Sequence, residues 1–136
     1  MNDSHRPPIN LRAGLWALAA FGSVGLLLEA FHGFKLGFYL EVAHETRRLL
    51  WRLAHAHGAL LGLVNVTYAL LARAWPRLDD ALASRALLTA LMLMPLGFAL
   101  GGAFASAGDP GASVGLAAAG GVALVFALCR LAWKAR

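Results

Sequence analysis

The chain has 136 residues, of which 60% are hydrophobic and only 14% are charged, and its formal net charge is +5. Because a soluble domain carries about 25% charged residues, this composition excludes an ordinary soluble globular protein. A mean hydropathy of +0.65 agrees with a membrane chain, and the length suits a single domain.

Four stretches are apolar and long enough to cross a bilayer. Their cores are residues 13–31, 53–72, 86–107 and 111–129, and the helices expected around them are about 12–34, 45–73, 82–107 and 111–133. Each approaches the ~20 residues that a helix needs to cross the hydrocarbon layer. Helices are expected because an unpaired backbone amide in lipid is costly and no segment alternates like a barrel strand. The sequence therefore predicts an all-α integral membrane protein, one domain over residues 1–136, built as an antiparallel bundle of four transmembrane helices.

The connection between the first two helices differs from the others. Residues 35–52 read "KLGFYLEVAHETRRLLWR" and mix aromatic with charged residues, which is typical of an interfacial segment. Polar and aromatic positions recur there at steps of three and four, so the second helix is expected to begin before the membrane does. These positions are Glu41, His44, Arg48, Trp51 and His55. The later connections, "AWPRLDD" (residues 74–80) and "SAGDPGAS" (residues 106–113), have turn chemistry.

The distribution of Lys and Arg predicts the orientation. With the N-terminus inside, eight of these residues lie on the inner side and four on the outer side, which agrees with the positive-inside rule. The inner set is Arg6, Arg12, Arg73, Arg77, Arg85, Arg130, Lys134 and Arg136, and the outer set is Lys35, Arg47, Arg48 and Arg52. We therefore expect a multi-pass protein of a bacterial-type inner (plasma) membrane with both termini cytoplasmic. Topology and anionic lipid explain the net charge, so the expected partners are the lipid bilayer and a second copy or a larger membrane complex, and no nucleic acid.

Ionisable residues gather at the predicted outer end of the first two helices. Glu29 and His32 lie near the end of the first helix, and His44, His55 and His57 lie at the start of the second. Antiparallel neighbours bring these ends together. An ionisable residue within a membrane helix costs several kcal/mol unless it is paired or hydrated, so Glu29 needs a partner.

Three interpretations of this cluster stay open. The residues could form a structural network that joins the first two helices, or Glu29 could bind one Zn or Cu ion together with His32 and His55 or His57. "EAFH" and "EVAH" have the Glu-x-x-His spacing of di-iron bundles, but the last two helices supply no further carboxylate within the membrane, which argues against a di-metal oxidase. In the third interpretation, a b-type haem lies between His32 and one of the two histidines on the facing helix.

The segment "LAHAHGALLGLVNVTYALL", residues 53–71, resembles the histidine-bearing segment of the haem-copper oxidase catalytic subunit and of small membrane proteins related to it. In that family the first histidine of the pair ligates haem, so the resemblance implies His55 as a haem ligand. The family supplies its other ligands from later helices, whereas this chain has no histidine after His57, which excludes a haem-copper centre within one chain. "FHGFK", residues 31–35, adds a likeness to small four-helix membrane proteins of uncharacterised function.

The sequence thus favours a non-catalytic membrane protein whose cluster binds b-type haem or one metal ion through Glu29, His32, His55 and His57. No serine or cysteine has a plausible base and no nucleotide fingerprint is present, which argues against other enzymes. One alternative is a small homodimeric transporter of protons or metal ions, and another is a structural subunit of a larger complex.

Two further polar residues of the second helix, Asn65 and Arg52, are expected to have structural roles, because a polar side chain in a membrane helix commonly joins two helices. His55 and His57 differ by about 200° around a helix, so they are predicted to face different neighbours.

Overall fold

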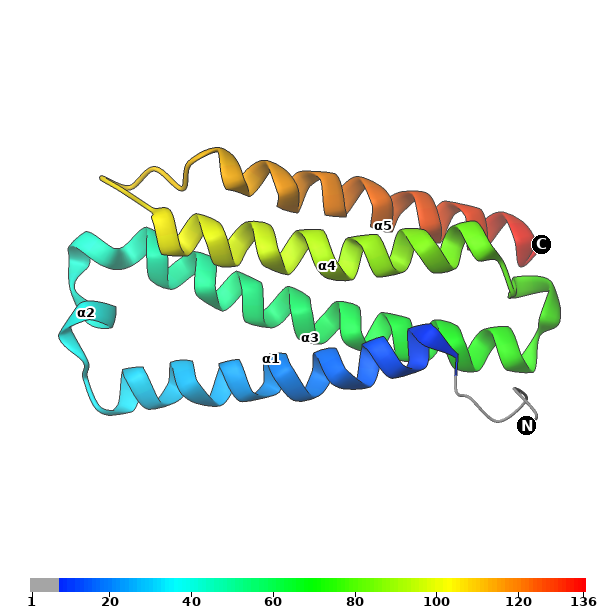
Figure 1. Cartoon of the computed structure of the whole chain (residues 1–136), viewed down its shortest axis with the longest axis horizontal. Coiled ribbons are helices and arrows are strands. Elements are labelled where there is room, and N and C mark those ends of the chain that lie inside the picture. Colours follow the sequence, from blue (N-terminus) through cyan, green and yellow to red (C-terminus); the bar gives the residue numbers. More distant parts are fainter. Residues whose placement is uncertain (1–7) are drawn as a thin grey trace, which may run out of the picture.

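The computed structural model describes residues 8–136, and its long elements are four α-helices (Figure 1). They are α1 (Ile9–Gly33), α3 (Glu45–Ala74), α4 (Ala81–Phe104) and α5 (Gly115–Lys134). Shorter helical turns lie between them: α2 (Gly37–Leu40), η2 (Val42–His44), η3 (Pro76–Leu78) and η4 (Ala112–Val114). Arg6, which the positive-inside rule assigns to the inner side, lies outside the described residues.

The helix ends differ most from the sequence expectation around the last connection. α4 ends at Phe104 and not near residue 107, and α5 begins at Gly115 and not near residue 111. A tight turn explains both differences, since Ser106 and Asp109 exchange two backbone hydrogen bonds of 3.0 and 2.9 Å. The backbone at Gly111 has a φ of 70°, which glycine adopts without strain.

All four long helices have the length and composition of membrane spans. α1 and α5 expose large apolar side chains over most of their surface, among them Trp16 (76% exposed) and Val122 (72% exposed). Apolar surface of this extent is typical of a protein whose surroundings are themselves apolar.

The helices pack as an open row. α1 packs on α3, α3 on α4 and α4 on α5, while α1 reaches α4 only marginally and makes no contact with α5 in the described part of the chain. The contacts between α1 and α3 run in opposite order, because Gly14 lies against Gly62 whereas Gly25 lies against His55. Each outer helix therefore packs along its length against one other long helix.

Small residues set the close contacts where α1 packs on α3 and where α5 packs on α4. A Cβ atom at Gly14 would lie 2.5 Å from the Gly62 carbonyl oxygen, and one at Gly120 would lie 2.7 Å from the backbone nitrogen of Met94. Helix backbones approach this closely only where a side chain is absent. The buried core between these contacts consists of Ala17, Leu61, Ala90, Leu91, Met94 and Ala117.

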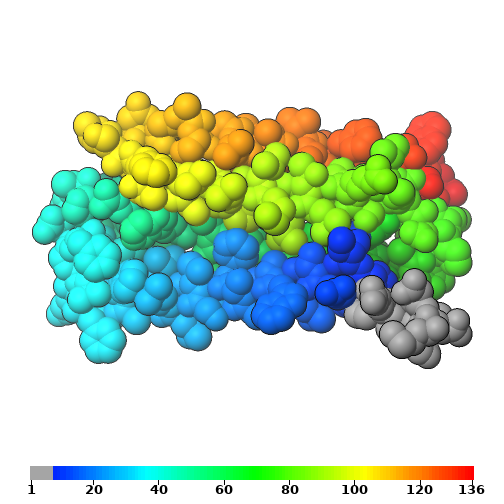
Figure 2. All heavy atoms as spheres, in the orientation of Figure 1, coloured from blue at the N-terminus to red at the C-terminus, as the bar shows by residue number. Residues whose placement is uncertain are grey.

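α1 and α3 diverge toward the end of the molecule that contains α2 (Figure 1). The residues that connect the two helices cover this end, as the cyan atoms in Figure 2 show. Tyr39 of α2 is 3% exposed, and its ring packs edge-on against Phe31 of α1 with 5.8 Å between the ring centroids. The connection is therefore anchored to α1 by an aromatic contact.

Candidate functional site

A pocket of about 880 Å³ lies between the diverging ends of α1 and α3, and we call it the wedge pocket. Its volume falls within the ~300–1,000 Å³ of sites for small molecules and cofactors. The residues that line it are Gly22, Gly25, Leu26, Leu28, Glu29 and His32 of α1, Tyr39 of α2, and Arg48, Leu49, Arg52, Leu53, His55 and Ala56 of α3. Glu29, His32 and His55, three members of the predicted cluster, thus line one pocket together with Arg52.

The imidazole of His55 is fixed by α1. Its Nδ1 atom lies 2.6 Å from the carbonyl oxygen of Phe21, and a carbonyl only accepts hydrogen bonds, so Nδ1 carries the proton. The ring also packs against Gly25, where a Cβ atom would lie 2.8 Å from Nδ1 and 2.9 Å from Nε2. In the neutral ring Nε2 then holds the free lone pair, which is the arrangement that metal-ligating histidines commonly show.

His57 faces another neighbour, as the angular separation of the two histidines predicts. Its Nδ1 atom hydrogen-bonds to the carbonyl oxygen of Leu53 in its own helix at 2.9 Å. Its ring packs against Phe98 of α4, with 4.9 Å between the centroids and a tilt of 39°. His57 does not line the wedge pocket.

The predicted site for a single metal ion requires several side chains that lie close together. Among residues 8–136, no three His, Cys, Asp or Glu side chains are placed to share a metal ion. Glu29 and His32 are exposed on α1, and His57 faces α4. A zinc site of three or four protein ligands is therefore not formed by these residues.

The second Glu-x-x-His pair lies apart from the wedge pocket. His44 and Glu41 precede α3, and the Nδ1 atom of His44 lies 3.8 Å from Oε2 of Glu41, beyond hydrogen-bond distance. This Nδ1 atom is buried and has no hydrogen-bond partner in the described part of the chain.

Two guanidinium groups of α3 contribute to the wedge pocket. Arg48 is half-buried and donates a hydrogen bond of 2.9 Å to the carbonyl oxygen of Tyr39, which ties α2 to α3. Arg52 follows four residues later and is exposed. Residues four apart lie on the same face of a helix, so both guanidinium groups flank the same region of the pocket.

Asn65 lies at the other half of α3, in a network that joins three helices. It is fully buried, and its Oδ1 atom accepts a hydrogen bond of 2.8 Å from Nδ2 of Asn10 in α1. Its Nδ2 atom donates to the carbonyl oxygens of Leu61 at 2.9 Å and Leu87 of α4 at 3.3 Å. Ser84 of α4 completes the network by donating to Oδ1 of Asn10. Asn65 therefore joins helices, as the sequence predicts for it.

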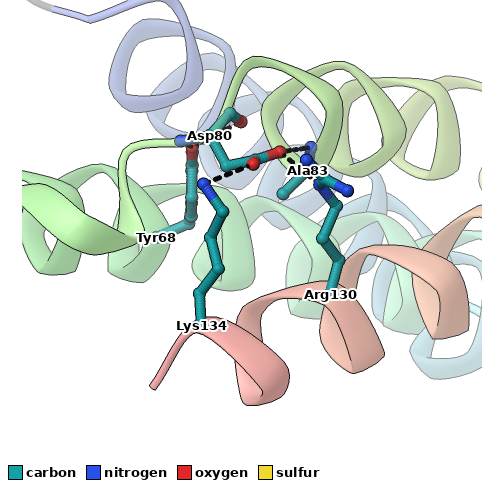
Figure 3. A network of polar contacts seen from close by, with 5 residues as sticks. All are labelled: Tyr68, Asp80, Ala83, Arg130 and Lys134. Carbon is teal, nitrogen blue, oxygen red and sulfur yellow. Dashed lines mark hydrogen bonds and ion pairs between the residues drawn. The ribbon is translucent and has the colours of Figure 1, made fainter. Parts of the chain in front are cut away.

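A second polar network closes the same end of the molecule around Asp80, the residue before α4 (Figure 3). Its Oδ1 atom accepts hydrogen bonds from the backbone nitrogen of Ala83 at 2.8 Å and from Nε of Arg130 at 2.7 Å. Its Oδ2 atom lies 2.7 Å from Nζ of Lys134. Tyr68 of α3 donates to the carbonyl oxygen of Asp80 at 3.0 Å and accepts from its backbone N–H at 3.1 Å.

This network holds Asp80 in its charged form. The hydrogen bonds from Arg130 and then from Lys134 lower the pKa of the Asp80 carboxyl well below its ordinary value, and the hydrogen bond from the Ala83 amide acts in the same direction. Burial of the carboxyl opposes them with a smaller effect. The ion pairs therefore fix α5 to the start of α4.

The sequence indicates a helix-joining role for Asn65 but not its partners, and it does not indicate the network around Asp80. The sequence places Asp80 in a turn, and it gives Arg130 and Lys134 only as charges that set the orientation. It gives no role to Asn10. One signal was available, because an aspartate directly before an apolar helix is a strong N-cap. Arg130 and Lys134 also stand four residues apart, which places them on one helix face.

Comparisons of the chain with protein-family models, with curated proteins and with solved structures found no match. The resemblance of residues 53–71 to a segment of the haem-copper oxidase catalytic subunit therefore stays a hypothesis.

Proposed function

We propose that the chain is a non-catalytic integral membrane protein that binds a b-type haem in the wedge pocket through Nε2 of His55. Its four long helices would cross a bacterial-type inner membrane in antiparallel order with both termini cytoplasmic. The span lengths and the exposed apolar surfaces of α1 and α5 support insertion, and the excess of Lys and Arg at one end supports the orientation. The wedge pocket then lies at the outer end.

The observation that carries this proposal is the environment of His55. Its ring is held between the Phe21 carbonyl and Gly25, and the same residue lines a pocket of about 880 Å³. A histidine whose other ring nitrogen donates to a backbone carbonyl is oriented for ligation. Four leucines and one alanine line the pocket, which gives an apolar macrocycle an apolar surface to contact.

Haem is favoured over a single metal ion because the two need different numbers of ligands. A zinc site takes three or four protein ligands, and no group of three is placed to hold one among residues 8–136. A haem iron takes one or two axial ligands, since the porphyrin supplies the rest. His32 of α1 lines the same pocket and is the candidate for the second axial ligand.

A spectrum of the purified protein tests the proposal. We expect a Soret band after expression with haem supply and purification in mild detergent, with iron bound stoichiometrically. His55→Ala should remove the band, whereas His57→Ala is the matched control and should retain it, because His57 faces Phe98. The absence of a Soret band would contradict the proposal, and the absence of stoichiometric Zn, Cu and Fe as well would leave His55 as a structural residue.

The structural alternative has an observation of its own, since the hydrogen bond between His55 and the Phe21 carbonyl joins α3 to α1. It predicts that His55→Ala lowers only the stability of the bundle, by about 1 kcal/mol. The transporter alternative gains no comparable support in the described part of the chain. Asn65 does not line the wedge pocket, and its hydrogen bonds to Asn10, Leu61 and Leu87 give it a structural role.

A further inference from the structure

The wedge pocket carries an excess of positive charge. Its charged lining residues are Arg48, Arg52 and Glu29, which is two cations against one carboxylate with the histidines neutral. Neither arginine has a carboxylate within 4.0 Å in the described part of the chain. Arg48 uses one of its five N–H donors on Tyr39, so most donors of both groups are available to a ligand.

Five aliphatic side chains also line the wedge pocket. Leu26 and Leu28 of α1 and Leu49, Leu53 and Ala56 of α3 form its walls, and Gly22 leaves space on α1. Leu26 is 74% exposed and Leu49 is 55% exposed, so the walls continue into the outward surfaces of both helices. In a bilayer those outward surfaces contact lipid, which gives acyl chains a lateral way into the pocket.

Guanidinium groups beside an aliphatic groove suit an amphiphilic ligand that has an anionic headgroup and a hydrocarbon chain. A soluble phosphate ion would leave the aliphatic walls without a contact, and a zwitterionic lipid would bring a cation toward the arginines together with its phosphate. Arginine pairs with phosphate through two parallel N–H donors, and phosphate headgroups lie at the membrane surface where the proposed topology puts this end of α3.

We propose that the wedge pocket binds one anionic phospholipid of the outer leaflet, with its phosphate between Arg48 and Arg52 and an acyl chain along Leu26 and Ala56. This inference rests on the proposed function only for the membrane topology and for the wedge pocket as a ligand site. It does not require iron or ligation by His55, and because the acyl chain would lie beside His55, lipid and haem would be alternative occupants of the wedge pocket.

The test counts phospholipids bound to the full chain after removal of loosely held lipid, by native mass spectrometry with added phosphatidylglycerol. We expect one retained phosphatidylglycerol, and binding that is at least about tenfold weaker for phosphatidylcholine, whose headgroup has no net charge. Arg52→Gln, which leaves the bond between Arg48 and Tyr39 in place, should weaken binding by roughly the same factor. Arg77→Gln, in the connection at the opposite end, is the matched control and should change nothing.

A second variant keeps the proposal testable if loss of an arginine perturbs the fold. Leu26→Trp adds bulk at the lateral opening of the wedge pocket and leaves both arginines in place, so it should also weaken retention of phosphatidylglycerol. Equal binding of the two lipids, or unchanged binding in Arg52→Gln and Leu26→Trp, would overturn the inference. Displacement of the lipid by millimolar inorganic phosphate would likewise overturn it in favour of a soluble anion.

The two proposals can fail separately. A Soret band without lipid retention would leave only the haem proposal, and lipid retention without a Soret band would leave only the lipid proposal.

Discussion

The ring of His55 on α3 lies directly against the backbone of Gly25 on α1, and a Cβ atom at residue 25 would overlap it. This contact determines how closely α1 and α3 approach beside the wedge pocket. It also holds the imidazole with Nδ1 2.6 Å from the Phe21 carbonyl oxygen.

Gly25→Ala should therefore displace the His55 ring and loosen the packing of α1 on α3. Overpacking costs about 1–3 kcal/mol, and the gain of up to ~1 kcal/mol in helix propensity from alanine offsets part of this cost. Gly33→Ala is the control, because a Cβ atom there has no neighbour within 4 Å. The free energy of unfolding, measured in mixed micelles with increasing SDS, should fall for Gly25→Ala and not for Gly33→Ala. Equal values for the two variants would contradict the contact.

The carboxyl group of Asp80 should stabilise the opposite end of the molecule. Asp80→Asn leaves Arg130 and Lys134 without their anionic partner, but these side chains are 38% and 33% exposed, so water compensates in part. We expect a loss of about 1–3 kcal/mol, below the 3–5 kcal/mol of a fully buried pair. Asp79→Asn is the matched control, since Asp79 is exposed and surface changes stay within ~0.5 kcal/mol. A thermal unfolding midpoint that is the same in both variants would rule out the stabilising role.

The same carboxyl should make stability depend on pH in the acid range. The folded-state pKa of Asp80 lies well below its ordinary value of 3.8, chiefly because of the hydrogen bond from Arg130. Its contribution is therefore complete above the unfolded-state pKa, and it is lost as the pH falls from about 4 toward the folded-state pKa. The unfolding free energy should decline below pH 4 in the wild type, and the decline should be shallower in Asp80→Asn. Identical slopes in the two proteins would show that other groups cause the decline.

Asn10 and Asn65 should be coupled energetically across α1 and α3. Asn65→Ala removes three hydrogen bonds from the buried network, and one of them is the bond that Asn10 donates to it. Hydrogen bonds between membrane helices average about 0.6 kcal/mol with a maximum of about 1.7 kcal/mol, so a loss of roughly 1–2 kcal/mol is expected. A double-mutant cycle with Asn10→Ala should give a non-additive term of at least ~0.5 kcal/mol. Additive losses would mean that the two side chains act independently, and Thr67→Ala, at an exposed position of α3, serves as the control.

The fold class was predictable because apolar spans of the required length allow helices and little else. The arrangement of the helices in a row was not predictable, because hydropathy is similar on all faces of a lipid-embedded helix and does not identify the neighbours of that helix. Glycine spacing was a partial guide: Gly58 and Gly62 both contact α1, whereas a Cβ atom at Gly111 or Gly115 would meet nothing within 4 Å. Small residues permit a close approach but do not require one.

The candidate site was predictable in part. The angular separation of His55 and His57 correctly assigned them to different neighbours, because it depends only on helix geometry. The association of Asp80 with Arg130 was not foreseen, because it joins residues 50 positions apart and depends on how α5 packs against α4. Sequence patterns report local geometry, and this ion pair is set by tertiary packing.

The absorption spectrum of His55→Ala before and after addition of imidazole tests the central claim most directly. Alanine removes the ligating nitrogen and leaves space for a free imidazole between Phe21 and the wedge pocket. We predict that the wild type has a Soret band, that His55→Ala lacks it, and that imidazole with added haem restores it, while His57→Ala resembles the wild type throughout. A wild-type protein without the band, or a His55→Ala variant that retains it without imidazole, would contradict the claim that His55 ligates haem.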